Sequence, residues 1–327
     1  MLTRMSLHSP TRVAVLGAGA VGCYYGGMLA RAGVPVTLVG RAGHVDAINE
    51  RGLLLDTLHF REHVRVPASE HTRVVADADV VLVCVKSGDT DGAARAMRPH
   101  LHPDALVVSL QNGVDNAERI AAATGREALA GVVYVGAHMA GPGHVRHTGR
   151  GDLVVGALDA GRASRERAGR VASLFADADV PCRVAVDIRS ELWTKLVLNC
   201  AYNAMSALTR LHYGPMLADA RGRALMTGIV AEAHAVARAA GVVLGEAASL
   251  ERVLALAEAM PMQVSSTSQD IALGRRTEID ALNGYLVRRA EALGVDVPVN
   301  RTLHALVKLR ELSAVSGDGK GDPTPAS

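Results

Sequence analysis

The stretch RVAVLGAGAVG, residues 12–22, constrains the fold of this chain more than any other. Residues 12–17 are rich in β-branched apolar side chains and end at a glycine, which predicts a short buried strand. The glycine-rich loop follows at once, and a helical stretch runs from about Val21 to Ala32. A strand that turns through glycines into a helix is the opening of a βαβ unit, and therefore of a parallel sheet.

The same alternation of strands and helices continues through the first half of the chain. Further strands are predicted at 34–40, 78–86 and 104–113. More strand-like runs follow residue 128, namely ALAGVVYVGA, HVRHT, DLVVGAL and VPCRVAV. Strands that alternate with helices predict a doubly wound α/β sheet in which the strands are parallel.

The pattern changes near residue 188. From there on the chain consists of long Ala- and Leu-rich helices without a strand signal, so we expect a domain boundary near 185–190. The final run, SGDGKGDPTPAS, is too polar and too rich in Gly and Pro to form a core. We predict an α/β domain over residues 1–187, an all-helical domain over 188–314 and a disordered tail over 315–327.

Composition limits the classes of partner. The 327 residues are 49% hydrophobic and carry a net charge of +2 without a long Lys/Arg run, so nothing favours nucleic acid or a membrane surface. No stretch resembles a signal peptide or a membrane span. The four cysteines are far apart and show no Cys-x-x-Cys spacing, which is typical of reduced thiols in a cytoplasmic protein: Cys23, Cys84, Cys182 and Cys200.

The loop GAGAVG predicts a dinucleotide site. Gly17 permits the tight turn, Gly19 lets the backbone approach a pyrophosphate, and Gly22 allows the helix to pack closely on the strand. Ala20 and Val21 complete the loop at the helix N-terminus, whose free N–H groups suit phosphate. The alternative is a tight βα turn that holds no ligand.

The second strand indicates which dinucleotide. NAD-binding proteins usually place an Asp or Glu about twenty residues beyond the glycine loop. Here no acid occurs between Gly17 and Val45, and Arg41 stands in its place. A guanidinium suits a 2′-phosphate, so we expect NADP(H). The alternative is that Arg41 is a solvated loop residue.

Two more strand ends carry candidate residues. Lys86 ends the strand at 78–86, and Asn112 lies in the QNG sequence that ends the next strand. Ligands bind beyond the carboxyl ends of strands in such sheets, so both are expected to face one crevice. Each also has an ordinary interpretation, Lys86 as a surface lysine and Asn112-Gly113 as a turn.

A polar stripe interrupts the apolar sequence ELWTKLVLNCAYN, residues 191–203. Lys195, Asn199 and Asn203 recur every fourth residue and therefore share one face of a helix. An ammonium and two amides suit a ligand with a carbonyl and a carboxylate, and the lysine can donate a proton. The alternative is an exposed polar face with a Glu191–Lys195 pair.

A second helical stretch is expected over residues 265–294. Ser266 followed by Gln269 fits a capping box at its start. Glu278 lies beside Arg275 and Arg276, so a solvated ion pair is its default interpretation. Spacing alone assigns no role to Ser266 or Glu278.

Taken together, five motifs resemble the ketopantoate reductase (2-dehydropantoate 2-reductase) family. They are GAGAVGCYYGGMLARAG, VCVKS, LQNGVD, ELWTKLVLNCAYNAMSAL and SSTSQDIALGRRTEIDALNGYLVRRA, which occur in the family's order. The resemblance runs from about Val13 to Leu309. It implies a Rossmann-type domain followed by a helical domain. It also implies NADPH-dependent reduction of ketopantoate to (R)-pantoate, in the pathway to pantothenate and coenzyme A.

The resemblance also implies roles for individual residues. Lys195 would be the catalytic general acid, and Glu278 would orient the substrate or the lysine. Asn112 would lie near the nicotinamide and substrate. The remaining residues would bind substrate (Asn199, Asn203 and Ser266) or the adenosine 2′-phosphate (Arg41 and Lys86).

Two other functions are compatible with these residues. A paralogue that reduces another 2-oxo acid would keep the same residues, and a dinucleotide-binding sensor would bind the cofactor without turnover. No metal is expected, because His138, His144 and His147 lack the partners of a zinc site. The long apolar helices of the second half are compatible with a homodimer.

Overall fold

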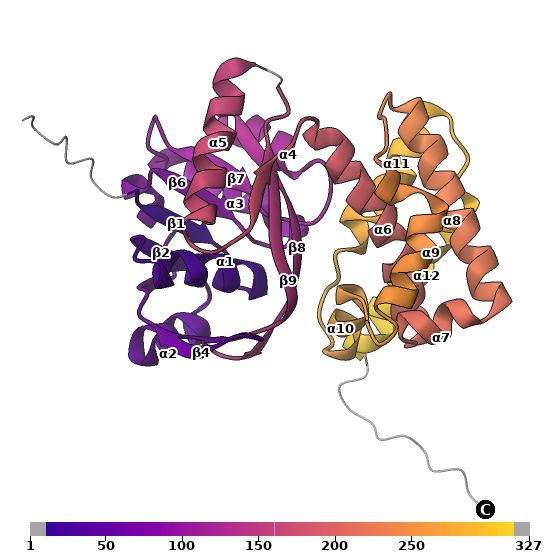
Figure 1. The fold of residues 1–327 in the computed structure, drawn as a ribbon, viewed down its shortest axis with the longest axis horizontal. Helices are drawn as coiled ribbons and strands as arrows, with labels where there is room; N and C mark the ends of the chain where they lie inside the picture. Colours follow the sequence, from indigo (N-terminus) through magenta and orange to yellow (C-terminus); the bar gives the residue numbers. More distant parts are fainter. Residues whose placement is uncertain (1–10, 160, 317–327) are drawn as a thin grey trace, which may run out of the picture. The chain divides into compact units, whose positions relative to one another are not determined.

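A computed structural model describes residues 11–159 and 161–316. The chain folds as two compact units that divide between Ile188 and Arg189. Figure 1 shows the first unit as strands and helices and the second as helices alone. No helix in the described part of the chain is long and apolar enough to cross a membrane.

The first unit is built on one sheet. Its strands are β1 (Val13–Leu16), β2 (Val36–Val39), β3 (Leu53–Asp56), β4 (Arg61–Val64), β5 (Ala68–Ser69), β6 (Val80–Val83), β7 (Leu106–Ser109), β8 (Ala128–Gly141), β9 (His144–Gly156) and β10 (Cys182–Val184). They lie in the order β4-β3-β9-β8-β7-β6-β1-β2-β5, and β10 pairs with β9. All residues of β1, β6 and β7 are buried, as expected for strands covered on both faces.

The sheet is parallel only in part. From β5 through β2, β1, β6 and β7 to β8, every neighbouring pair is parallel, which confirms the expectation for this region. The β8–β9 and β3–β4 pairs are antiparallel, so the whole sheet is mixed. HVRHT and DLVVGAL, expected as two strands, form the single strand β9, which bends at Arg150 (φ 55°) and Gly151 (φ 144°).

Helix α1 lies within the curl of this sheet. The helices of the unit are α1 (Ala20–Arg31), α2 (Ala42–Arg51), α3 (Thr90–Met97), α4 (Asn116–Thr124) and α5 (Arg162–Ala176), with 3-10 turns η1 (Thr72–Asp77), η2 (Ser87–Asp89) and η3 (Arg98–His100). α1 contacts β1 and β2 as well as β3, β8 and β9. A Cβ at Gly26 would lie 2.8 Å from Leu38, and one at Gly27 would lie 2.7 Å from Leu55. Two adjacent glycines therefore let α1 pack against both parts of the curled sheet.

The second unit is helical, as predicted, and its described residues contain no strand. Its elements are α6 (Ile188–Thr209), α7 (Tyr213–Ala218), α8 (Ala220–Ala239), η4 (Glu246–Ala248), α9 (Leu250–Ala259), α10 (Ser266–Ala272), η5 (Ile279–Ala281), α11 (Asn283–Leu293) and α12 (Pro298–Ser316). α8 packs against α7, α9, α11 and α12. The buried Tyr202 of α6 donates its hydroxyl to the Val253 carbonyl of α9, which fixes α6 in this bundle.

Two expectations for this unit need correction. The stretch 265–294 is not one helix, because Gly274 adopts φ +61° after α10 and the chain then turns through η5 into α11. α12 extends to Ser316, so the first two residues of the predicted tail are helical. The rest of that tail, 317–327, lies outside the described residues.

Candidate active site

Four parallel strands of the first unit end in register. Leu16 at the end of β1 pairs with Val39 of β2 and with Val83 of β6, and Val83 pairs with Ser109 of β7. The glycine loop, Arg41, Lys86 and Asn112 all follow these ends directly. The structure therefore brings the predicted cofactor residues of this unit to one edge of the sheet.

The three glycines of the loop differ in the space around a Cβ atom placed on each. Gly17 has φ +111°, and a Cβ there would lie 2.7 Å from the backbone of Cys84. A Cβ at Gly22 would lie 2.1 Å from the Gly17 carbonyl oxygen. A Cβ at Gly19 would meet nothing within 4 Å. The fold itself thus requires Gly17 and Gly22, whereas the open space at Gly19 is room for a ligand.

The N-terminus of α1 fits a phosphate. Gly19 is its N-cap and supplies no side-chain hydrogen bond, and the first turn holds no acidic residue. The first N–H groups of a helix, here at Ala20 and Val21, have no partner within the helix itself. An anion placed over Gly19 would meet these groups and the positive end of the helix dipole. The loop therefore fits the pyrophosphate of a dinucleotide.

Arg41 lies where β2 passes into α2. Its carbonyl accepts the N–H groups of His44 and Val45, so its backbone forms the N-cap of α2. Its side chain is exposed. This position leaves the guanidinium in solvent beyond the end of β2, where the second strand of a dinucleotide fold meets the adenosine ribose.

Lys86 and Asn112 are half-buried, and their loops are joined by a hydrogen-bond network. The Ser87 hydroxyl donates to the Asn112 carbonyl (2.5 Å). The Asn116 side-chain amide donates to the same carbonyl (2.6 Å). The backbone of Asn112 is thereby tied to the loop that carries Lys86.

Two further side chains extend this loop network, whose buried neutral members are Ser87, Thr90, Gln111 and Asn116; the Arg119 guanidinium also donates to the Ser87 carbonyl (2.9 Å). The Gln111 amide donates to the Val85 carbonyl (2.9 Å) and to the Thr90 hydroxyl (2.7 Å). Thr90 in turn donates to the Asn116 side-chain oxygen (2.8 Å). All four side chains are buried. Sequence reasoning named only Gln111 among them, within the QNG that ends a strand, because single Ser, Thr and Asn residues near strand ends carry no distinctive signal.

In the second unit, α6 carries the polar stripe on one face. Lys195 and Asn199 are half-buried, and Asn203 is only 4% exposed. A solvated polar face is therefore the wrong interpretation for the end of the stripe at Asn203. A buried amide in an apolar helix is retained where it makes hydrogen bonds.

Ser266 lies at the start of α10, but it is not the cap. Ser265 is the N-cap and accepts the Ser268 N–H, so the expected capping box is displaced by one residue. The Ser265 hydroxyl donates to the Asn203 carbonyl (3.3 Å), and its N–H donates to the Ser206 hydroxyl (3.3 Å). These bonds hold the start of α10 to α6 at Asn203, and Ser266, the first residue of α10, is exposed.

Glu278 lies in the turn between α10 and α11. It is half-buried and forms the N-cap of the short turn η5, while Arg275 and Arg276 are exposed. Asn283, at the start of α11, donates its side-chain amide to the Cys200 carbonyl of α6 (3.3 Å). The segment that carries Glu278 is therefore held to α6 one residue beyond Asn199.

The cysteines are not candidate nucleophiles. Burial raises the pKa of Cys23 and of Cys182 to about 12, so both remain protonated thiols at neutral pH. Burial also raises the pKa of Cys84 and Cys200.

Among the residues that the structure describes, no group of three or more His, Cys, Asp or Glu side chains is placed to hold a metal ion. His138, His144 and His147 lie on β8 and β9. His144 contacts Asp56 (3.1 Å), and His147 contacts the Arg150 carbonyl. His144 and His147 therefore already have contacts within the protein.

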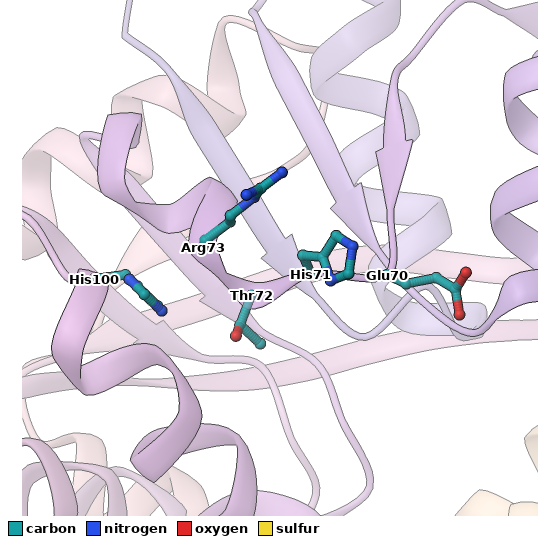
Figure 2. A pocket seen from close by; sticks show the side chains of 5 residues that line it. All are labelled: Glu70, His71, Thr72, Arg73 and His100. Atoms are coloured by element: carbon teal, nitrogen blue, oxygen red, sulfur yellow. The ribbon is translucent and has the colours of Figure 1, made fainter.

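A surface hollow of about 300 Å³ lies elsewhere on the first unit, lined by Glu70, His71, Thr72, Arg73 and His100. Figure 2 shows Glu70 and His100 at opposite ends of it, so the five side chains do not converge on one point. None of the predicted site residues lines this hollow. We assign it no role.

Comparison with known proteins shows the family to which the chain belongs. The family model "Ketopantoate reductase PanE/ApbA" matches residues 13–160, and its C-terminal counterpart matches residues 187–311. A 2-dehydropantoate 2-reductase of Halobacterium salinarum is 36% identical over 92% of this chain and 99% of that protein.

Solved structures of similar proteins have the same fold. A PanE/ApbA family ketopantoate reductase from Ralstonia eutropha JMP134 is 51% identical, with a TM-score of 0.87 over 93% of this chain and 100% of that one. A D-mandelate dehydrogenase, 23% identical with a TM-score of 0.86, covers 93% of this chain and 99% of its own and shows likeness of fold alone. The chain therefore belongs to the ketopantoate reductase family of oxidoreductases.

Proposed function

We propose that this protein reduces ketopantoate to (R)-pantoate with NADPH and that Lys195 is the general acid. The observation that carries the proposal is the stripe on α6. Lys195 and Asn199 are half-buried there, Asn203 is buried, and Ser266 starts the helix that packs beside Asn203. One proton donor followed by amide and hydroxyl groups suits a substrate with a ketone next to a carboxylate.

The cofactor is assigned to the first unit. The loop Gly17–Gly22 and the N–H groups of Ala20 and Val21 would hold the pyrophosphate. Arg41 and Lys86 would bind the 2′-phosphate, which makes NADPH the preferred dinucleotide. Asn112 would lie near the nicotinamide. Bound NADPH supplies a hydride to the keto carbon of the substrate.

The second unit would supply the proton. The Lys195 ammonium donates a hydrogen bond to the ketone oxygen, stabilises the negative charge that develops there, and then transfers its proton. Asn199, Asn203 and Ser266 would hold the carboxylate and hydroxyl groups of the substrate. Glu278 would orient the substrate or Lys195. These contacts orient the ketone for reaction, which is a large part of catalysis.

The choice of ketopantoate rests on the relatives. The 2-dehydropantoate 2-reductase of Halobacterium salinarum and the ketopantoate reductase of Ralstonia eutropha match this chain over more than nine-tenths of its length. The polar residues of the proposed site recognise a ketone and a carboxylate, which all 2-oxo acids share. The assay must therefore include competitors.

The test is the oxidation of NADPH with ketopantoate and with a panel of other 2-oxo acids. We expect turnover on ketopantoate with NADPH preferred over NADH, and Arg41→Ala should weaken that preference about tenfold or more, because a charge-assisted bond is lost. Lys195→Ala should lower kcat about a hundredfold or more. Lys195→Arg keeps the charge but cannot give up a proton near neutral pH, so it should also lose kcat.

The outcomes separate the alternatives. Turnover on another 2-oxo acid with none on ketopantoate would replace the substrate and leave the chemistry in place. NADPH binding without oxidation of any substrate would identify a sensor. Full activity of Lys195→Ala would contradict the role of the lysine.

A further inference from the structure

The turn that carries Glu278 is held by charged side chains of α12, which bond the residues on either side of Glu278. This feature deepens the proposed function, because it concerns how Glu278 is kept in position, and it rests on the role proposed for Glu278. Glu278 begins the short 3-10 turn η5, in which its carbonyl accepts the Ala281 N–H (2.9 Å). So short a turn has fewer backbone hydrogen bonds than a helix, so contacts made by the neighbouring residues also help to fix its position.

Thr277, the residue before Glu278, is fixed at three points. Its N–H and its hydroxyl both donate to the Glu311 carboxylate, at 2.8 and 2.6 Å. Its hydroxyl oxygen also accepts the Ile279 N–H (3.2 Å), which bridges over Glu278. Thr277 is 5% exposed and Ile279 is fully buried. The backbone of Glu278 is thus clamped on both sides.

Asp280 is fixed from the same helix. One carboxylate oxygen contacts the His304 imidazole (2.8 Å), and the other accepts a hydrogen bond from the Lys308 ammonium (2.9 Å). Lys308 also forms an ion pair with Glu311 (2.6 Å). A continuous chain of bonds therefore runs from Thr277 through Glu311 and Lys308 to Asp280. We call Thr277, Asp280, Lys308 and Glu311 the turn clamp.

The clamp is ionised. Burial raises the pKa of Glu311, but hydrogen bonds from Lys308 and Thr277 outweigh it and leave that pKa below its ordinary value. Burial likewise raises the pKa of Asp280, and hydrogen bonds from Lys308 and His304 reverse the effect. The clamp therefore holds the turn with charge-assisted bonds at neutral pH.

We propose that Glu311 and Lys308 are positioning residues for the reaction. They act through Thr277 and Asp280 to fix the backbone at Glu278, and they do not themselves touch the substrate. A misplacement of a reacting or orienting group by about 1 Å costs up to about a hundredfold in rate, so a held turn matters even though the clamp does no chemistry. A purely structural role would affect the stability of α12 alone.

A double-mutant cycle on kcat distinguishes these roles, because two residues that act through one another have non-additive effects. Glu311→Gln removes the charge that holds Lys308, and Thr277→Val removes the hydroxyl with little change of volume. We expect each to lower kcat about tenfold, with a smaller change in the KM for the 2-oxo acid. Thr277→Ser restores the hydroxyl and should restore kcat. In a Glu278→Gln background, Glu311→Gln should lower kcat less than twofold further.

Asp219→Ala is the matched control. Asp219 is also a carboxylate that accepts a backbone N–H, that of Arg221 (2.8 Å), but it caps α8 and has no bond to the turn that carries Glu278 among those described. It should lower the melting temperature about as much as Glu311→Gln does and leave kcat within twofold. All assays are run at least 15 degrees below each variant's melting point, so that only folded protein is compared.

The results have distinct meanings. Unchanged kcat in both Glu311→Gln and Thr277→Val, with an active wild type, would overturn this inference alone. Additive losses for Glu278→Gln and Glu311→Gln would do the same, because Glu311 would then act independently of Glu278. A wild type that turns over no 2-oxo acid would overturn the proposed function together with this inference.

Discussion

The two loops that carry Lys86 and Asn112 and the turn that carries Glu278 are held in place by different chemistry. In the first unit the buried members of the loop network are neutral side chains, Ser87, Thr90, Gln111 and Asn116, each at most 5% exposed. In the second unit the turn clamp consists largely of ions. The side chains of Lys308 and Asp280 are 37% and 40% exposed.

This difference predicts how each region responds to its surroundings. A buried neutral network keeps its hydrogen bonds over a wide pH range, but a single missing partner leaves a buried group unsatisfied. At Lys308 and Asp280, which are partly exposed, the ionic clamp tolerates substitution better, since water solvates the partner that remains, whereas Glu311 is only 12% exposed. The clamp depends on pH, because its carboxylates must stay ionised. The loops of Lys86 and Asn112 should therefore be sensitive to mutation and the Glu278 turn to acid.

The largest effect is expected at the glycine loop. Gly22→Ala would place a Cβ against the Gly17 carbonyl, 2.1 Å away, and should destabilise the first unit by about 3 kcal/mol or more. Gly19→Ala is the matched control, because its Cβ meets nothing of the protein itself. It should leave the melting temperature unchanged and weaken NADPH binding. Equal melting temperatures for the two variants would contradict this account of the loop.

A smaller but still large effect is expected at Gln111. Gln111→Leu removes the donor to the Val85 carbonyl and to Thr90, and each buried group left unsatisfied costs about 1–3 kcal/mol. We expect a lower free energy of unfolding by denaturant, together with a raised KM for NADPH. The loss of stability should be the same at pH 5 and pH 8. A loss that changes strongly between these values would show that the network is not neutral.

The smallest effect concerns acid. The folded-state pKa values of Glu311 and Asp280 lie below their ordinary values of 4.5 and 3.8. Their stabilisation is therefore complete above those ordinary values and is lost as the pH falls through the lower folded-state values. The free energy of unfolding should fall on acidification from about pH 5 to 3, and less steeply in Glu311→Gln. Denaturant titrations at several pH values in this range test the prediction. If the free energy of unfolding fell equally steeply with pH in the wild type and in Glu311→Gln, an ionised Glu311 would be contradicted.

Local signals predicted much of the fold. The strands at 12–17, 34–40, 78–86 and 104–113 were predictable because β-branched runs and glycine turns act over a few residues. The β3–β4 hairpin was missed, since LLLD and REHV lack clear alternation. The break in 265–294 was missed because the apolar period continues through Gly274, whose positive φ ends α10.

In the candidate site, too, local features were predictable from the sequence and features set by tertiary packing were not. The stripe from Lys195 to Asn203 could be predicted from helical spacing on one element, and the glycine loop from its own sequence. The turn clamp could not be predicted, because Thr277 and Glu311 are 34 residues apart and only the packing of α12 brings them together. The cap at Ser265 rather than Ser266 depends on which hydroxyl faces α6, a fact of tertiary structure.

The wrapping of the sheet around α1 has a consequence for the order in which the protein is made. α1 leaves the ribosome before β9, residues 144–156, yet it packs against that strand, and its buried Tyr25 hydroxyl donates to the Gly151 carbonyl. A nascent chain that stops before β9 therefore leaves part of the apolar surface of α1 in water. Contacts this distant in sequence slow folding and prolong exposure to aggregation. The glycine loop and α1 are thus synthesised long before the strand that completes the packing around α1.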